Sequence, residues 1–299
     1  MANRHFAKLA DVWKHLPLAE ILSIERPANY WETHAGNATY PMIVDAERAY
    51  GALRFVEVAP AVPGLAHSRY FAHLRSLNPS PGPLRFYPGS PMLGMLELAD
   101  TASYLFCDTD AASVADLEAA GSRLGLGSRV RVVGTDGMTA LHEALDRVNG
   151  PTLAHIDPYD PWGKGPSGLS ALDLAGELIG RGIGVVYWYG YDRPEGRTWA
   201  LDTLRQSAST ALWCGDVMIA SPGGQGEAGD LGVATTPGTG FGVVCAHISP
   251  EAIAACRQLG EELVRAYADG VLPDGSAGSL DFTERSASSS GSPGANRRG

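Results

Sequence analysis

Short apolar runs recur along the chain, and between them lie segments in which apolar residues repeat every three to four positions. The runs have the length and the apolar content of buried strands. Seven of them predict strands at residues 29–32, 103–107, 129–133, 152–156, 184–189, 212–219 and 242–248. Continuous apolar strands of this kind are typical of a sheet that is covered on both faces.

Four segments between or after these strands have helical periodicity, at residues 111–123, 138–148, 169–179 and 250–268. The last is the clearest, because Ser249 can cap it and Pro250 suits its first turn. The alternation predicts an α/β fold, a doubly wound and mainly parallel seven-stranded sheet with helices on both faces. Such a sheet binds ligands at the carboxyl ends of its strands.

Two regions interrupt the alternation. Residues 41–91 contain helical patches at 46–53 and 68–77 and no clear strand, which predicts a small helical insertion between the first two strands. Residues 271–299 are rich in serine and glycine and lack apolar periodicity, so we expect a disordered tail there. Residues 1–270 are expected to form one domain that contains the insertion.

The charge of the chain restricts its partners. The formal net charge is −10 at pH 7, and the sequence pI is about 5.2. This disfavours a nucleic-acid substrate without excluding it, because proteins that bind phosphates usually present a basic surface. The chain lacks a long apolar stretch and the apolar core of a signal peptide, so we expect a cytoplasmic protein without membrane contact. The four cysteines have no metal-ligand spacing, and no metal is expected.

Polar residues and turns follow the first four predicted strands. A turn that contains Gly36 follows the first strand, and Asp108, Asp136 and Asp157 follow the next three. A nucleoside-containing cofactor needs a glycine where the backbone approaches it and an acidic residue for its ribose hydroxyls. Aspartate is also a common turn and helix N-cap residue, so each position has a structural interpretation as well. Together the four ends favour a nucleotide-type site.

A series of motifs follows one another in a fixed order along the chain. They are His5 with A-D-V-W-K-H at 10–15, T-H-A-G at 33–36 with Tyr40, Y-P-G-S-P at 87–91, D-G at 136–137, I-D-P at 156–158, Y-W-Y at 187–189 and G-T-G at 238–240. In these motifs and their order the chain resembles the bacterial methyltransferases that modify N6 of an adenine in 23S ribosomal RNA. The resemblance implies a class I methyltransferase-like fold and S-adenosylmethionine as cofactor.

The same resemblance implies roles for individual residues. Lys14, His15 and Ser90 would contact the methionine end of the cofactor. Asp108 would hold the ribose hydroxyls, where the family usually has Glu, and Asp136 would accept a hydrogen bond from the adenine amine. The full implied set of cofactor-binding residues is Lys14, His15, His34, Gly36, Ser90, Asp108, Asp136 and Asp157.

Asp157, Pro158 and Tyr159 would be the catalytic residues. Methyl transfer from a sulfonium is an in-line displacement, so the enzyme mainly aligns the nucleophile with the methyl group. The amine of adenine is a poor nucleophile because its lone pair is delocalised into the ring. Oxygen acceptors for its N–H groups favour a more pyramidal nitrogen and stabilise the positive charge that develops there. Enzymes with this chemistry typically carry D/N-P-P followed by an aromatic residue that stacks on the base.

The chain departs from that pattern, with D-P-Y-D-P-W at 157–162. A tyrosine replaces the second proline, and an acid stands where the stacking aromatic is expected, so Tyr159, Asp160 and Trp162 are the candidates for the acceptor side. Pro17 is a second departure and is expected to kink or end the first helix.

Three functions stay open at this point. The first is an RNA adenine-N6 methyltransferase with 23S rRNA as its partner and a basic rim. The rim would use Arg69, Arg75, Arg85, Arg193 and Arg197. The second is a methyltransferase of the same fold that acts on a small-molecule amine or a natural-product intermediate, which the altered loop and the acidic charge favour. The third is a protein that binds the cofactor without catalysis. The pattern of residues does not specify the oligomeric state.

Overall fold

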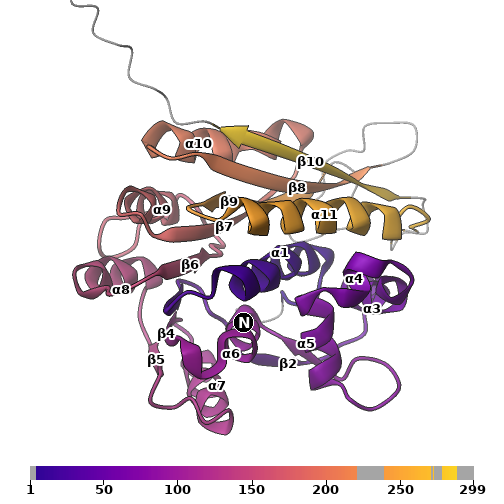
Figure 1. Ribbon diagram of the computed structural model, residues 1–299, viewed down its shortest axis with the longest axis horizontal. Helices are drawn as coiled ribbons and strands as arrows, with labels where there is room; N and C mark the ends of the chain where they lie inside the picture. Colours follow the sequence, from indigo (N-terminus) through magenta and orange to yellow (C-terminus); the bar gives the residue numbers. More distant parts are fainter. Residues whose placement is uncertain (1–4, 221–238, 271, 273–277, 288–299) are drawn as a thin grey trace, which may run out of the picture.

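The computed structural model describes residues 5–220, 239–270, 272 and 278–287. In this part of the chain, eight strands form one sheet. They are β1 Asn29–Glu32, β4 Ser103–Cys107, β5 Val130–Val133, β6 Thr152–Ile156, β7 Gly184–Tyr191, β8 Leu212–Ala220, β9 Gly240–Ala246 and β10 Ser279–Ala287. Across the sheet their order is β10-β8-β9-β7-β6-β1-β4-β5 (Figure 1).

The directions of the strands place the ends of β1, β4, β5, β6 and β7 along one edge, because these five strands are parallel. In contrast, β9 is antiparallel to its neighbours β7 and β8, and β10 is antiparallel to β8. The predicted doubly wound, mainly parallel sheet is confirmed, and the seven predicted strands are present to within two residues at each end. The sheet has eight strands rather than seven because β10 extends its edge.

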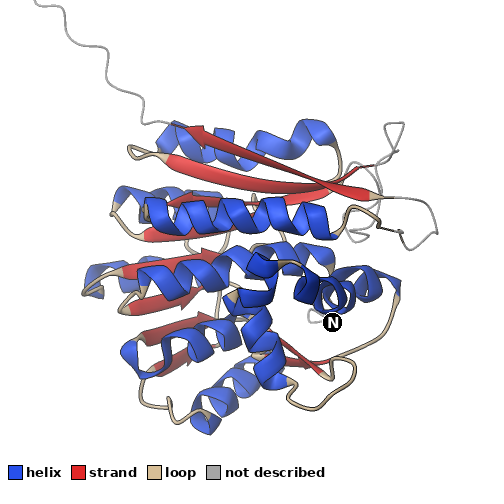
Figure 2. Ribbon diagram, turned by 45° about the vertical axis from the view of Figure 1, so that its right-hand side comes forward, coloured by secondary structure: helices blue, strands red, loops and turns tan. Residues whose placement is uncertain are grey.

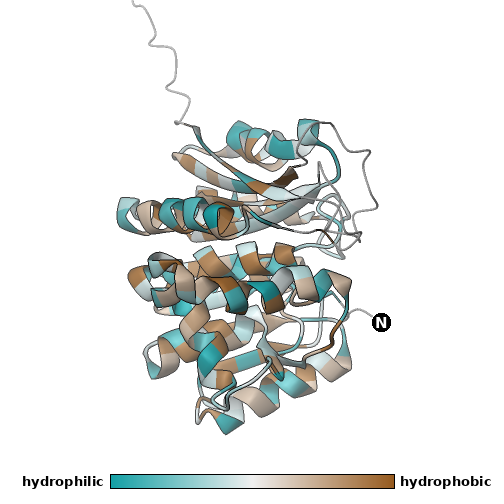
Figure 3. Ribbon diagram, turned by 90° about the vertical axis from the view of Figure 1, so that its right-hand side faces the viewer, coloured by the Kyte–Doolittle hydropathy of each residue, from teal (hydrophilic) through white to brown (hydrophobic). Residues whose placement is uncertain are grey.

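Helices cover both faces of the sheet (Figure 2). One face packs against α1 Leu9–Glu25, α6 Ser90–Leu98, α7 Ala111–Arg123 and α11 Pro250–Ala266. The other face packs against α8 Gly137–Ala144, α9 Ala171–Gly180 and α10 Trp199–Ser207. Hydrophilic and hydrophobic residues alternate along these helices (Figure 3), as expected for helices with one buried side. The helices predicted at 111–123, 138–148, 169–179 and 250–268 are all present, with α8 ending four residues early in a 3₁₀ turn at Leu145–Arg147.

Ahead of α6, the insertion between β1 and β4 contains four short α-helices and also a small sheet. The helices before α6 are α2 Ala46–Arg48, α3 Arg54–Val58, α4 Pro63–His67 and α5 Arg69–Leu77. The strands β2 Thr39–Pro41 and β3 Phe86–Pro88 pair antiparallel, so the prediction of an insertion without strands is wrong. Strands of three residues are too short to show a period-two pattern. Asn78 supports the pair, because its side-chain oxygen accepts the backbone N–H groups of Arg85 and Phe86.

Helix α1 is the central helix of its layer, and it continues through Pro17 to Glu25. The expectation that Pro17 could end the helix is therefore wrong. A proline removes one backbone donor, but α1 packs against α11 and its side chains from Leu9 to Leu22 are nearly all buried, and this packing outweighs one lost hydrogen bond. The helix ends at Arg26, whose left-handed φ of 42° caps it. No helix among the described residues is both long and apolar enough to cross a bilayer.

Strand β10 corrects the prediction of a disordered tail for residues 279–287. Phe282 packs edge-on against Trp13 of α1, with 5.4 Å between ring centroids. Asp281 accepts a hydrogen bond from Arg197 at 2.8 Å, and Glu284 accepts one from Arg257. The low apolar content of the tail did not predict this strand. Its stability comes from a long antiparallel pairing with β8 and a few side-chain contacts, which a hydrophobic pattern does not reveal. Residues 271, 273–277 and 288–299 lie outside the described part.

Candidate functional site

The turn after β1 is fixed against the end of β4. Gly36 has a φ of 62°, in the left-handed region that glycine adopts without strain. Its backbone N–H donates to Oδ2 of Asp108 at 2.8 Å, and the backbone N–H of Asp110 donates to Oδ1 at 2.8 Å. The predicted glycine turn and the predicted acid of the second strand therefore contact each other. Each carboxylate oxygen has a further lone pair with which it can accept a hydroxyl hydrogen.

His34 lies among three of the predicted acidic residues. Burial lowers the pKa of its imidazole, while the carboxylates of Asp157, Asp108 and Asp136 act in the opposite direction. Printed distances bring the strand ends together: Gly36 contacts Asp108, Gly137 packs against Thr33, and Gly165 in the loop after β6 lies against Asp136. The turns after β1, β4, β5 and β6 therefore lie side by side at the edge of the sheet where the parallel strands end.

Asp136 serves as the N-cap of α8, which is the structural role that the sequence analysis considered for it. Its Oδ2 accepts the backbone N–H of Thr139 at 2.8 Å and the hydroxyl of the same residue at 2.7 Å. The first residue of the helix, Gly137, lies so close to the turn after β1 that an added Cβ would stand 2.0 Å from the carbonyl oxygen of Thr33. On its other side, Asp136 is close to Gly165 in the loop after β6. Its position at the site and its capping role are compatible, because capping uses one oxygen.

Lys14 and Asp157 form a buried ion pair between α1 and the end of β6. Lys14 Nζ lies 2.6 Å from Oδ2 of Asp157 and 2.9 Å from Oδ1 of Asp11. Burial favours the neutral form of each group, but the opposite charge prevails. The ammonium holds the pKa of Asp157 below its ordinary value, and the carboxylates raise the pKa of Lys14 above its own. Both groups are therefore charged at neutral pH.

His15 is buried and presents an unused donor. The hydroxyl of Tyr70 donates to the hydroxyl of Tyr87, which in turn lies 2.9 Å from Nδ1 of His15. Since burial and then Lys14 lower the pKa of His15 well below its ordinary value, the ring is neutral, and the Tyr87 hydroxyl donates to Nδ1. This places the ring proton on Nε2. That atom is buried and has no hydrogen-bond partner among the described residues.

Glu32 and His155 belong to the same buried region but were not predicted. Glu32 ends β1 and accepts hydrogen bonds from the hydroxyls of Tyr30 at 2.6 Å and Ser90 at 2.7 Å. His155 Nδ1 lies 3.6 Å from Glu32, and neither ring nitrogen of this fully buried side chain has a hydrogen-bond partner in the described part. The signal for Glu32 was its position as the last residue of the first strand. His155 gave none, because a lone histidine inside a strand usually packs in the core.

The acceptor-side candidates diverge in space. Pro158 is buried, but the side chain of Tyr159 is 95% exposed and does not cover Asp157. Asp160 closes a turn by accepting the backbone N–H groups of Trp162 and Gly163, each at 3.0 Å. Trp162 is 60% exposed and packs against Trp199 at the start of α10, with ring centroids 5.5 Å apart. Of Tyr159 and Trp162, Trp162 is therefore the one whose ring packs against another aromatic ring.

The arginines expected to form a basic rim are not all available for it. Arg197 donates to Asp216 at 2.6 Å and to Asp281 at 2.8 Å, so it is part of a largely buried network rather than a rim. Arg69 donates to Glu97 at 2.8 Å. The remaining three are exposed, namely Arg75, Arg85 and Arg193.

Two further expectations concern residues elsewhere. Within the described ranges, no group of three or more histidine, cysteine or acidic side chains is arranged to hold a metal ion. In the motif at 238–240, residue 238 lies outside the described part. Thr239 precedes β9 and Gly240 begins it, and an added Cβ at Gly240 would stand 2.2 Å from the hydroxyl of Tyr191. The small residue there is explained by packing.

Comparisons with known proteins establish a fold for the chain. No family model and no curated protein matches it. Among solved structures it is similar to protein LPL1258 from Legionella pneumophila str. Philadelphia 1, described as DUF519, with a TM-score of 0.73 and 19% identity over 96% of this chain and 99% of that chain. At this identity the similarity shows a shared fold.

Two weaker similarities are to proteins described by their cofactor. One is a SAM-dependent methyltransferase from Agrobacterium tumefaciens, with a TM-score of 0.40 and 12% identity over 79% of this chain and 61% of that chain. The other is cofactor-bound Rv0187 from MTB, with a TM-score of 0.35 and 12% identity over 82% of this chain and 84% of that chain. These two are too distant to assign a fold or an activity. The similarity to LPL1258 therefore shows a shared fold over almost the whole length of this chain.

Proposed function

We propose that this chain is an S-adenosylmethionine-dependent N-methyltransferase whose cofactor lies at the carboxyl edge of β1, β4, β5 and β6. The observation that carries the proposal is the convergence of Lys14, His34, Asp108, Asp136 and Asp157 at that edge. The cofactor presents three groups to the protein, namely an anionic carboxylate, the two hydroxyls of its ribose and the amine of its adenine. The site offers donors at one end and acceptors along the rest, in the order that the motif resemblance implies.

The residues fit this cofactor at the methionine end. His15 carries a buried N–H on Nε2 without a partner among the described residues, and the ammonium of Lys14 belongs to the adjacent residue of α1. A methionine carboxylate would receive a hydrogen bond from Nε2, which satisfies a buried donor that otherwise costs free energy. Ser90 would act here through Glu32, to which its hydroxyl donates.

The residues also fit the nucleoside end. Asp108 would accept the ribose hydroxyls with the lone pairs that Gly36 and Asp110 leave free. Asp136 caps α8 through Oδ2, which leaves Oδ1 for the adenine amine. Gly36, in its left-handed conformation, lets the backbone of the turn pass close beneath the cofactor.

Asp157 would act on the acceptor. When bound, the cofactor supplies an electrophilic methyl group on a sulfonium. Lys14 holds Asp157 ionised through Oδ2, so Oδ1 is the oxygen that accepts a hydrogen bond from the acceptor amine. This hydrogen bond orients the nitrogen lone pair and stabilises the charge that forms on nitrogen as the methyl group transfers.

The acceptor that the resemblance implies is N6 of an adenine in 23S rRNA, and we propose it as the first to test. A small-molecule amine is the second candidate. Two observations favour it, since Tyr159 does not cover Asp157 and Arg197 is engaged in buried ion pairs instead of a basic rim. Both candidates place the reacting amine against Asp157.

The experiment is methyl transfer from labelled S-adenosylmethionine to protein-free 23S rRNA, with the product nucleosides identified by mass spectrometry. Stoichiometric N6-methyladenosine supports the first acceptor. No transfer, with cofactor binding present by calorimetry on the same sample, contradicts the RNA acceptor and leads to a screen of small amines. A protein that binds the cofactor and methylates neither class lacks the proposed activity.

A further inference from the structure

A cavity of about 380 Å³ lies beside the loop that follows Asp157, between α9 and α10. The loop contributes Trp162 and Lys164, and α9 contributes Leu172, Asp173 and Glu177 to the lining. Its volume is in the range of small-molecule sites. None of these residues belongs to the cofactor site described above, but the loop connects the two, because Trp162 follows Asp157 by five residues.

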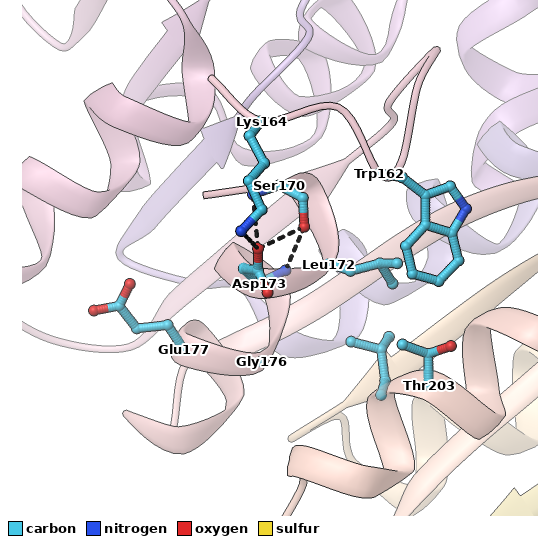
Figure 4. A pocket seen from close by; sticks show the side chains of 9 residues that line it. Trp162, Lys164, Ser170, Leu172, Asp173, Gly176, Glu177 and Thr203 are labelled. Atoms are coloured by element: carbon cyan, nitrogen blue, oxygen red, sulfur yellow. Dashed lines mark hydrogen bonds and ion pairs between the residues drawn. The ribbon is translucent and has the colours of Figure 1, made fainter. Parts of the chain in front are cut away.

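Trp162 gives the cavity an aromatic wall. Figure 4 shows its indole at one side of the cavity with Leu172 and Thr203 next to it. The ring is 60% exposed, although an indole gains free energy when it is covered, and it packs against Trp199. An exposed aromatic ring with a fixed neighbour and an apolar floor is suited to stacking with a planar ring.

The opposite side of the cavity carries acceptors of hydrogen bonds. Asp173 is held by the backbone N–H and hydroxyl of Ser170 through Oδ2, which orients its carboxylate (Figure 4). Glu177 pairs through Oε2 with His142 at 2.8 Å. Each carboxylate therefore has a second oxygen to offer. Lys164 is 67% exposed and 3.9 Å from Asp173, a distance at which it contributes little to holding that residue.

We propose that this cavity is a subsite for a nucleobase that carries an exocyclic amino group, adjacent to the adenine that is methylated. The base would stack on Trp162, and its amino group would donate to Asp173 or Glu177. A base with a carbonyl at that position would place its carbonyl oxygen against a carboxylate oxygen, so that two hydrogen-bond acceptors would face each other. The exposed ammonium of Lys164 is placed to contact a neighbouring phosphate. This inference rests on the proposed function, because such a subsite serves an acceptor that contains bases.

The test measures the affinity of cytidine and uridine by calorimetry, in the absence of cofactor. The two nucleosides differ where cytidine has an amino group and uridine a carbonyl, and neither contains the adenine that the cofactor site would take. Cytidine should bind roughly fivefold or more tightly than uridine. The Trp162→Ala variant should lose at least about fivefold in cytidine affinity, and Trp162→Phe should restore most of it.

Charge variants test the second half of the proposal. Glu177→Gln and Asp173→Asn offer an amide that can donate to uridine, so the preference for cytidine should shrink in at least one of them. The Glu118→Gln variant on α7 and Phe86→Ala, which removes an exposed aromatic residue of the insertion, are matched controls and should bind cytidine as the unmodified chain does. Thermal melting checks that the Trp162→Ala variant is folded, which is the expected result for a side chain that is 60% exposed.

Equal affinity for cytidine and uridine, or a Trp162→Ala variant that binds cytidine unchanged, would overturn the proposal. Binding of phenylethylamine without binding of either nucleoside would also overturn it, because the cavity would then recognise an organic cation. The measurement needs neither cofactor nor turnover. A failure here with intact methyl transfer removes the subsite alone, whereas absent cofactor binding removes the proposed function and leaves the nucleoside result standing.

Discussion

Lys14 Nζ lies 2.6 Å from Oδ2 of Asp157, and this contact joins the first helix of the chain to the end of the fourth strand of the parallel series. The two residues are far apart in the sequence, and each is largely buried. The pair keeps Asp157 ionised and fixes which oxygen it uses. Helix α1 is therefore part of the site as well as part of the core.

Replacing Lys14 by methionine should destabilise the fold. The substitution keeps the volume of the side chain but leaves Asp157 partly buried without its cation, which costs about 2–4 kcal/mol in the free energy of unfolding. Urea denaturation measures the change. Lys164→Met removes an exposed lysine and should shift the free energy by no more than about 0.5 kcal/mol. Equal stability of the two variants would show that the ion pair contributes nothing measurable.

Replacing Asp157 by alanine should abolish methyl transfer while cofactor affinity changes by no more than a few-fold. The reason is that Asp157 contacts the acceptor amine through Oδ1 in the proposed arrangement, whereas Lys14 keeps Asp11 as a partner. Turnover with labelled cofactor and calorimetry on the same preparation separate the two effects. Asp146→Asn, at an exposed position in the 3₁₀ turn that follows α8, is the control and should retain activity. Unchanged turnover in Asp157→Ala would refute its assignment.

Stability should fall as the pH drops below about 6.5. Burial holds the pKa of His15 well below its ordinary value of 6.5, so the unfolded chain binds a proton there that the folded chain does not. The contribution of neutral His15 to the free energy of unfolding is therefore fully present above pH 6.5. It is lost as the pH falls toward the pKa that His15 has in the folded chain. Between pH 7.5 and pH 6 the loss is on the order of 1 kcal/mol.

Urea midpoints at these two pH values measure that loss, and His15→Gln should have a smaller difference between them. Burial raises the pKa of Asp216 to about 6, so this group acts in the opposite sense, with stability falling as the pH rises from 3.8 to about 6. Asp216 still titrates just above pH 6, so the comparison of His15→Gln with the unmodified chain is what isolates the contribution of His15. An unchanged pH difference in His15→Gln would contradict the buried neutral state of His15.

Replacing Gly137 by alanine should destabilise the chain and weaken the cofactor site together. The added Cβ would stand 2.0 Å from the carbonyl oxygen of Thr33, so α8 or the turn before His34 must move. Overpacking of this kind costs about 1–3 kcal/mol. Gly180→Ala, at the end of α9, meets no atom within 4 Å and should be neutral or slightly stabilising. Thermal melting compares the two, and equal melting temperatures would argue against close contact between α8 and the turn.

Much of the fold follows from the sequence because its strands are continuous apolar runs and its helices have a clear period. The strand ends with Gly36, Asp108, Asp136 and Asp157 could be placed at one edge, since parallel strands end together. The motif resemblance implied a contact of Lys14 with the cofactor, and the ion pair of Lys14 with Asp157 was not predicted. No local pattern indicates which strand end a side chain on the first helix will reach.

What could not be predicted depends on long-range pairing. β10 has a weak apolar pattern of its own, and it forms because Phe282 and Asp281 find partners on α1 and before α10. Strand β1 has only four residues, and its sequence did not indicate that Glu32 would lie beside His155 of the neighbouring strand β6. The tyrosine in place of proline at Tyr159 signalled an altered loop, but the outward direction of that side chain depends on the turn that Asp160 closes.

The central claim is the cofactor site, and the most direct measurement is calorimetric titration of S-adenosylmethionine into the full chain and into Asp108→Ala. We expect binding with one-to-one stoichiometry, weakened in the variant by about 1.5–3 kcal/mol through loss of hydrogen bonds to a charged group. Asp202→Ala, at an exposed position on α10, should bind as the unmodified chain does. No binding to the folded chain, or equal binding by the Asp108→Ala variant, would contradict the account.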